Sequence, residues 1–145
     1  ELQAALGRAQ LARARRALQM RAGNFAVIRD ALAGIPHVRI VDATDPRAVN
    51  SHYCMSVVLE PPLAAHRGEL IAKLNRAGVG TSIYYPQPVP RMSYYRDKYG
   101  YDASRWPNAT ELSDASVALP VGPHVTADDA ERIGSTVAET IRGLR

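Results

Sequence analysis

The chain has 145 residues, of which 46% are hydrophobic and 22% are charged. This is the composition of an ordinary globular protein, and it excludes a disordered tail. No apolar run approaches the roughly 20 residues that a membrane-spanning helix needs, and no secretion leader is recognisable. Cys54 is the single cysteine, so no internal disulfide can form, which favours a reducing compartment. We therefore expect a cytoplasmic protein of one domain, or part of a larger protein, with no membrane contact.

The charge is concentrated at the start of the chain. Residues 1–33 contain six arginines and two acidic residues, which accounts for the whole net charge of +4. A basic helix can contact nucleic acid, but the tyrosines that would stack on bases lie far along the chain. We expect a solvated or subunit-facing helix and no nucleic-acid partner. A stand-alone binding or regulatory module that docks through this basic helix is the alternative.

A long helix is predicted over residues 1–34, because apolar residues recur at spacings of three and four. Gly34, just before Pro36, is a suitable end. A helix of about 30 residues would be about 45 Å long, more than a small domain needs. We therefore expect it to bridge domains or to pack against a second subunit. No capping residue precedes Glu1, and we expect the natural protein to begin earlier.

Residues 35–145 are predicted to form a small α+β domain. Strands are expected over residues 38–41, 51–60, 81–85 and 116–120, and helices over 65–77, near 92–98 and after Thr126. In the strand over 51–60, Tyr53, Met55, Val57 and Leu59 should share one face. Thr126 offers an N-cap oxygen to the last helix. This order predicts a small, mostly antiparallel sheet flanked by helices.

No catalytic residue and no metal site is predicted. The four histidines lack metal-ligand spacing and there is no Cys-x-x-Cys, while Cys54 reads as an inert thiol in mid-strand. Glu111 and Asp114 are expected in a turn. Lys73 falls on the polar side of the helix expected over 65–77 and Lys98 has charged neighbours, whereas a Schiff-base lysine needs a desolvated pocket.

The stretch from Gly78 to Asp102 holds six of the seven tyrosines, interleaved near its start with Pro86, Pro88 and Pro90. It is either a long loop anchored by aromatic side chains or the rim of a site for a polar ligand. Tyrosine faces and hydroxyls suit sugars and nucleotides, and an arginine after the prolines can bind a phosphate or carboxylate. Tyr84, Tyr85 and Arg91 are therefore the candidate substrate-binding residues. If the strand reaches Tyr85, the two tyrosines should face opposite sides.

Three segments, ELQAALGRAQL, RAGVGTSIYYPQPVP and LPVGPHVTADDAERI, resemble in order the C-terminal part of DegT/StrS-type sugar aminotransferases. These are pyridoxal-phosphate enzymes with the aspartate-aminotransferase type of fold. The resemblance implies that residues 35–145 are the small domain of that fold. It also implies that the large domain, with the Schiff-base lysine and most of the cofactor site, lies outside this chain. Which residues of this chain touch the cofactor is left unknown.

The resemblance further implies a homodimer that moves an amino group, usually from glutamate, to a keto group on a nucleotide-linked sugar or a cyclitol. Tyr84 and Tyr85 would then line the substrate mouth. Many family members have a histidine shortly after the double proline, where this chain has Pro90 and Arg91, so Arg91 is the candidate substitute. A sugar dehydratase, in which a histidine replaces the lysine, is the alternative within the same fold.

Overall fold

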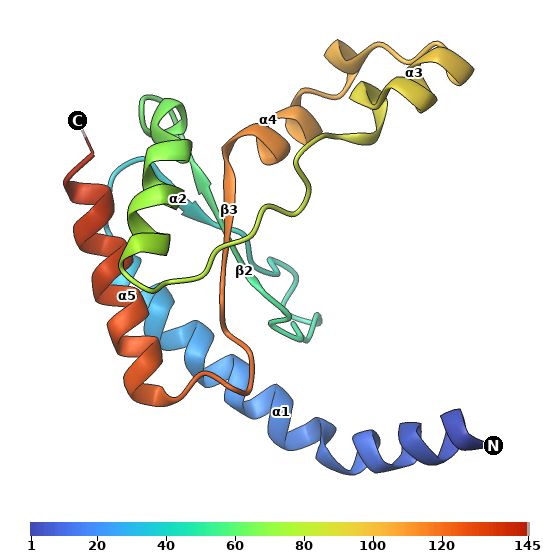
Figure 1. The fold of residues 1–145 in the computed structure, drawn as a ribbon, viewed down its shortest axis with the longest axis vertical. Helices are drawn as coiled ribbons and strands as arrows, with labels where there is room; N and C mark the ends of the chain where they lie inside the picture. Colours follow the sequence, from blue (N-terminus) through green and yellow to red (C-terminus); the bar gives the residue numbers. More distant parts are fainter. Residues whose placement is uncertain (145) are drawn as a thin grey trace.

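The computed structural model describes residues 1–144. Its three strands form one antiparallel sheet in the order β1-β2-β3, and its longest element is the N-terminal helix (Figure 1). This confirms the predicted α+β class with its small sheet and long first helix. The elements are α1 (Leu2–Leu32), β1 (Val38–Ile40), β2 (Met55–Leu59), α2 (Arg67–Arg76), α3 (Ser93–Tyr99), α4 (Pro107–Ala115), β3 (Ser116–Leu119) and α5 (Ala127–Arg142). Short 3₁₀ turns lie at Leu63–His66, Val89–Arg91 and Ala103–Arg105.

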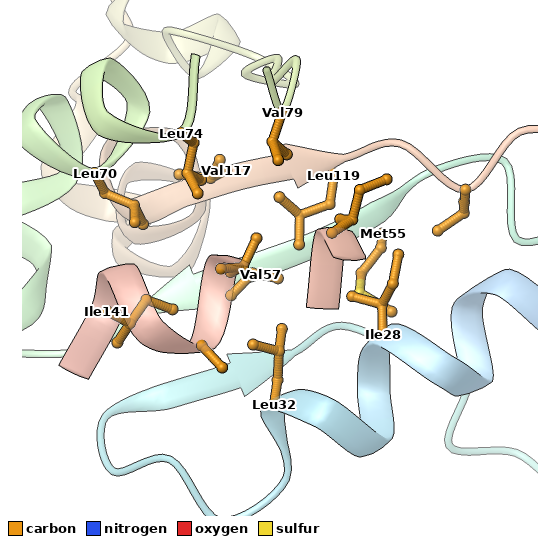
Figure 2. Packing of buried hydrophobic residues seen from close by; sticks show 14 of the residues in the cluster. Ile28, Leu32, Met55, Val57, Leu70, Leu74, Val79, Val117, Leu119 and Ile141 are labelled. Atoms are coloured by element: carbon orange, nitrogen blue, oxygen red, sulfur yellow. The ribbon is translucent and has the colours of Figure 1, made fainter. Parts of the chain in front are cut away.

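The core lies between one face of the sheet and the helices α1, α2 and α5 (Figure 2). Met55, Val57 and Leu59 alternate along β2 and all three belong to the buried cluster, as the alternation in the sequence predicts. Val58, between them, is fully buried as well, and α4 contacts both β2 and β3. The central strand is therefore covered on both faces.

Helices α1 and α5 make the most extensive contact between any two elements. Gly134 of α5 lies where the two helices approach closely: a Cβ placed there would lie 2.8 Å from the Cβ of Ala31 and 3.5 Å from the Cα of Ile28. Neither neighbour can swing away, since one is an alanine and the other is backbone. The two helices can pack at this distance because glycine has no side chain at position 134.

Gly134→Ala is expected to destabilise the protein by about 1 to 3 kcal/mol, because the added methyl overpacks the α1–α5 contact. Gly23→Ala in α1 is the matched control, since among residues 1–144 no atom other than those of the adjacent residues and the helix's own backbone lies within 4 Å of a Cβ at that position. It should raise the free energy of unfolding by up to about 1 kcal/mol, the helix-propensity gain of alanine over glycine. Urea unfolding followed by circular dichroism measures both. Equal effects of the two substitutions would contradict the close approach.

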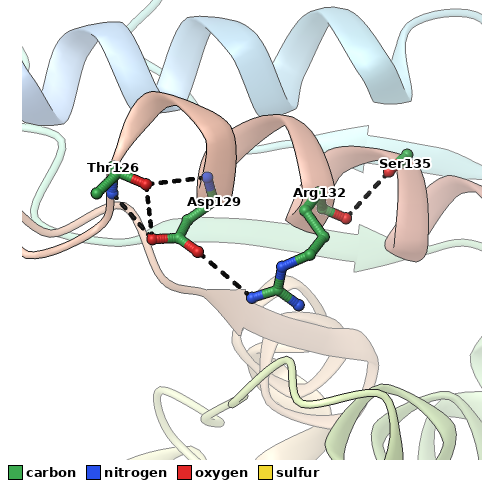
Figure 3. A network of polar contacts seen from close by, with 4 residues as sticks. All are labelled: Thr126, Asp129, Arg132 and Ser135. Carbon is green, nitrogen blue, oxygen red and sulfur yellow. Dashed lines mark hydrogen bonds and ion pairs between the residues drawn. The ribbon is translucent and has the colours of Figure 1, made fainter.

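The start of α5 is fixed by a capping box (Figure 3). The backbone N–H of Asp129 donates to the Thr126 hydroxyl over 3.1 Å, and the Thr126 backbone N–H donates to the Asp129 carboxylate over 3.3 Å. The hydroxyl also donates to that carboxylate over 2.7 Å, and Arg132 lies 3.5 Å from its other oxygen. The predicted N-cap at Thr126 is therefore confirmed, and it satisfies backbone donors that the first turn leaves unpaired.

Thr126→Ala is expected to lower the free energy of unfolding by about 1 kcal/mol at neutral pH. The Thr126 side chain, then its backbone N–H, then Arg132 lower the pKa of Asp129 from its ordinary 3.8. A lowered pKa in the folded state means that the stabilisation is complete above about pH 4 and is lost as the pH falls through the folded-state pKa. The difference between the two proteins should therefore shrink in acid. An undiminished difference at pH 3 would contradict the role of the carboxylate.

Three local predictions are wrong. The expected strand over 81–85 is reduced to a single bridge, in which Ser82 and Ala118 exchange both backbone hydrogen bonds; the prolines that follow lack the N–H groups a ladder needs. Glu111 and Asp114 lie in α4 and not in a turn, and that helix begins with a proline at its first position. Tyr53 and Cys54 precede β2, and Tyr53 is exposed.

No helix within residues 1–144 is both long enough and apolar enough to cross a membrane.

Candidate functional site

The tyrosine-rich segment and α4 line an open pocket of about 840 Å³, here called the aromatic pocket. Tyr84 and Tyr85 both line it, and the expectation that they face opposite sides does not apply, because it required a strand that reaches Tyr85. The sheet ends at the Ser82 bridge, and the strict alternation of a strand no longer applies. The other lining residues are Pro86, Gln87, Pro88, Val89, Pro90, Met92, Tyr95, Tyr101, Trp106, Ala109, Leu112 and Ser113.

The outer wall of the aromatic pocket is a series of packed rings, of which the first two pairs are stacked and the last pair meets edge to face. Ring centroids are 6.2 Å apart for Tyr95 and Tyr99, 5.5 Å for Tyr99 and Tyr101, and 5.4 Å for Tyr101 and Trp106. These rings belong to an arm of α3, the 3₁₀ turn at Ala103–Arg105 and the start of α4, which projects away from the sheet (Figure 1). The later tyrosines therefore pack on one another and stiffen the arm. Trp106 is the wall residue that the sequence analysis overlooked.

Arg91 lies outside the aromatic pocket. It lines a separate hollow of about 560 Å³ with Thr110 and Glu111, and one of its Nη atoms lies 2.7 Å from the Asp114 carboxylate. The α4 residues that line the hollow and those that line the aromatic pocket, such as Leu112, point to opposite faces of the helix. The structure thus brings the two tyrosines together and leaves Arg91 on the far side of α4.

A second pocket shares Tyr84 with the aromatic pocket. It has a volume of about 280 Å³ and is called here the Arg21 pocket. Arg21 of α1, Tyr53 and His124 line it together with the backbone around Gly80 and Gly122. No motif in the sequence joins these residues, which come from four distant segments.

Both lysines make surface contacts. Nζ of Lys73 lies 2.7 Å from the Glu69 carboxylate and lowers its pKa more than His66 does. Nζ of Lys98 donates to the Tyr94 hydroxyl over 3.0 Å. Neither lysine lines any of the pockets described above. Within residues 1–144 no three His, Cys, Asp or Glu side chains gather in a way that could hold a metal ion.

Residues 1–138 match the model of the DegT/DnrJ/EryC1/StrS aminotransferase family. The spore coat polysaccharide biosynthesis protein SpsC of Bacillus subtilis is 28% identical over 144 residues, which are 99% of this chain and 37% of SpsC. The chain therefore spans little more than a third of the length of this relative.

Two solved structures show the same fold. DesV of S. venezuelae, determined in complex with a ketimine intermediate, is 26% identical with a TM-score of 0.87, and the match covers 99% of this chain and 37% of DesV. The putative sugar aminotransferase Spr1654 of Streptococcus pneumoniae, determined in a PLP form, is 21% identical with a TM-score of 0.85. That match covers 95% of this chain and 34% of Spr1654.

The residues of this chain do not by themselves fit pyridoxal phosphate. The cofactor requires a lysine amine in a desolvated site, and both Lys73 and Lys98 lie in surface contacts outside the pockets. The described part of the chain therefore has pockets but no lysine amine that lines one of them.

Proposed function

Because the chain belongs to the DegT/DnrJ/EryC1/StrS aminotransferase family, we propose that it is the C-terminal domain of an enzyme that transfers an amino group from glutamate to a keto sugar. The sugar is nucleotide-linked, and the enzyme is a homodimer of cytoplasmic location. Residues 1–34, which contain α1, join the domains, and residues 35–145 form the small domain. The aromatic pocket around Tyr84 and Tyr85 is the observation that carries the proposal.

Pyridoxal phosphate, held mainly by a large domain outside this chain, would supply the electron sink for the transfer. The Schiff-base lysine belongs to that domain as well. The surface contacts of Lys73 and Lys98 and the share of the relatives' length that this chain covers support this division. This chain's own part is to bind and orient the sugar.

The aromatic pocket is suited to binding and orienting a sugar. Flat rings of tyrosine and tryptophan pack against the apolar faces of a sugar or a base, while tyrosine hydroxyls donate to its oxygens. The pocket volume of about 840 Å³ lies within the range of small-molecule sites. Arg91, behind α4, is proposed to bind the anionic part of the substrate, since a guanidinium offers two parallel donors to a phosphate.

The N-terminal half of α1 supports the expected domain-joining or dimer-forming role. Leu2, Leu6 and Leu11 are 86%, 62% and 74% exposed, and this half of the helix extends beyond the rest of the molecule (Figure 1). A helix gains most of its stability from packing an apolar face. These leucines are proposed to pack on the large domain or on the second subunit.

Tyr85→Ala and Arg91→Ala in the full-length enzyme should each raise KM for the nucleotide sugar about tenfold, the loss expected when one good contact is removed. The value of kcat should change by less than about twofold, since binding alone is weakened. Tyr94→Ala and Arg96→Ala are the matched controls. Both are exposed residues of the same arm that line none of the pockets described above.

Steady-state kinetics with glutamate at saturation measures these constants. Unchanged KM values for Tyr85→Ala and Arg91→Ala, or equal changes in the two controls, would contradict the proposed substrate site.

A further inference from the structure

Apart from Tyr84, the Arg21 pocket has no lining residue in common with the proposed sugar site, and it is built from specifically positioned polar groups. Asn24, one turn after Arg21 on α1, is only 7% exposed. Its side-chain amide lies 3.0 Å from the carbonyl oxygen of Val125, 3.2 Å from that of Gly122 and 3.4 Å from that of Val121. One buried amide thus fixes the loop that forms a wall of the pocket to the helix that carries Arg21.

The same loop positions His124. Its imidazole lies directly over Gly122, where an added Cβ would be 2.6 Å from the ring carbon Cε1 and 2.8 Å from Nδ1. A side chain at position 122 would therefore push the ring out of its place. The imidazole can lie beside the pocket because Gly122 has no side chain and because the Asn24 contacts fix the loop.

The Arg21 side chain forms no ion pair within residues 1–144, and its Nε is screened from solvent without a hydrogen-bond partner there. Its guanidinium stacks over Tyr53, 5.6 Å from the ring centroid. A screened donor that lacks an acceptor is costly, and an anion is the ligand that satisfies it.

The other residues that line the Arg21 pocket also suit an anion. Among the described residues no aspartate or glutamate lines the pocket, while Thr81, Ser82, Tyr84 and His124 do. The volume of about 280 Å³ is at the small end of ligand sites, too small for a whole nucleotide sugar. The chemistry and the size both indicate a single small oxyanion.

We propose that the Arg21 pocket is a binding site for a small anion, a phosphate or a carboxylate group, held by the Arg21 guanidinium with His124 and the neighbouring hydroxyls. The site is separate from the aromatic pocket and shares only Tyr84 with it. The inference does not depend on the aminotransferase proposal, because the kinetic constants for the sugar and the binding of a free anion are measured independently.

Isothermal titration calorimetry of the full-length protein with inorganic phosphate, and separately with glutarate, tests the site. We expect saturable one-to-one binding of at least one of these anions. Arg21→Gln should weaken this binding at least about tenfold, as expected for loss of one charge-assisted hydrogen bond. Arg21→Lys should retain part of it. Arg29→Gln is the matched control, because Arg29 lies on the same helix, is paired with Asp30 and lines none of the pockets described.

The two anions distinguish the sources. If Arg21→Gln loses only phosphate binding, the site takes a phosphate group. If it loses only glutarate binding, the site takes a carboxylate. His124→Gln, which leaves the helix untouched, is the second variant and should weaken binding by about threefold or more, as expected for the loss of a weaker contact. Absence of binding of both anions, or equal binding by the wild type and a folded Arg21→Gln variant, would overturn the proposal.

Discussion

The attachment of α1 to the rest of the domain determines the arrangement of the Arg21 pocket. Gly134 allows α5 to approach α1 closely, and Asn24 binds the loop after β3 through three carbonyl oxygens. A buried amide that lost these partners would be left unsatisfied at a cost of about 1 to 3 kcal/mol. The two contacts therefore fix where Arg21 points and how far the exposed half of α1 extends from the core.

The second constraint is the early end of the sheet at Ser82. Beyond this residue Pro86, Pro88 and Pro90 have no N–H to donate to a neighbouring strand. The chain therefore leaves the sheet and continues into the arm of α3, the 3₁₀ turn at Ala103–Arg105 and the start of α4. Because this segment is not a strand, its side chains need not alternate between two faces, and Tyr84 and Tyr85 can both face the aromatic pocket. Stacked and edge-to-face rings from Tyr95 to Trp106 then stabilise the arm. The tyrosines thus serve partly as scaffold and partly as pocket wall.

Much of the fold follows from local patterns in the sequence. The spacing of apolar residues predicts α1 and α5, Thr126 marks the start of α5, and alternation identifies β2. The site is harder to predict from the sequence, because its residues meet only through tertiary packing. Arg21 and His124 are about a hundred positions apart, and no spacing rule links them. Residues 81–85 look like a strand by composition, but the sheet offers them only one bridge, an example of tertiary context overriding propensity.

The central claim is that this domain binds substrate while the reactive amine comes from elsewhere in the protein. Borohydride reduction of the full-length protein loaded with pyridoxal phosphate, followed by peptide mass spectrometry, tests it most directly. The account predicts a pyridoxyl group on one lysine outside the sequence from Glu1 to Arg145. A pyridoxyl group on Lys73 or Lys98, or on no lysine at all, would contradict it.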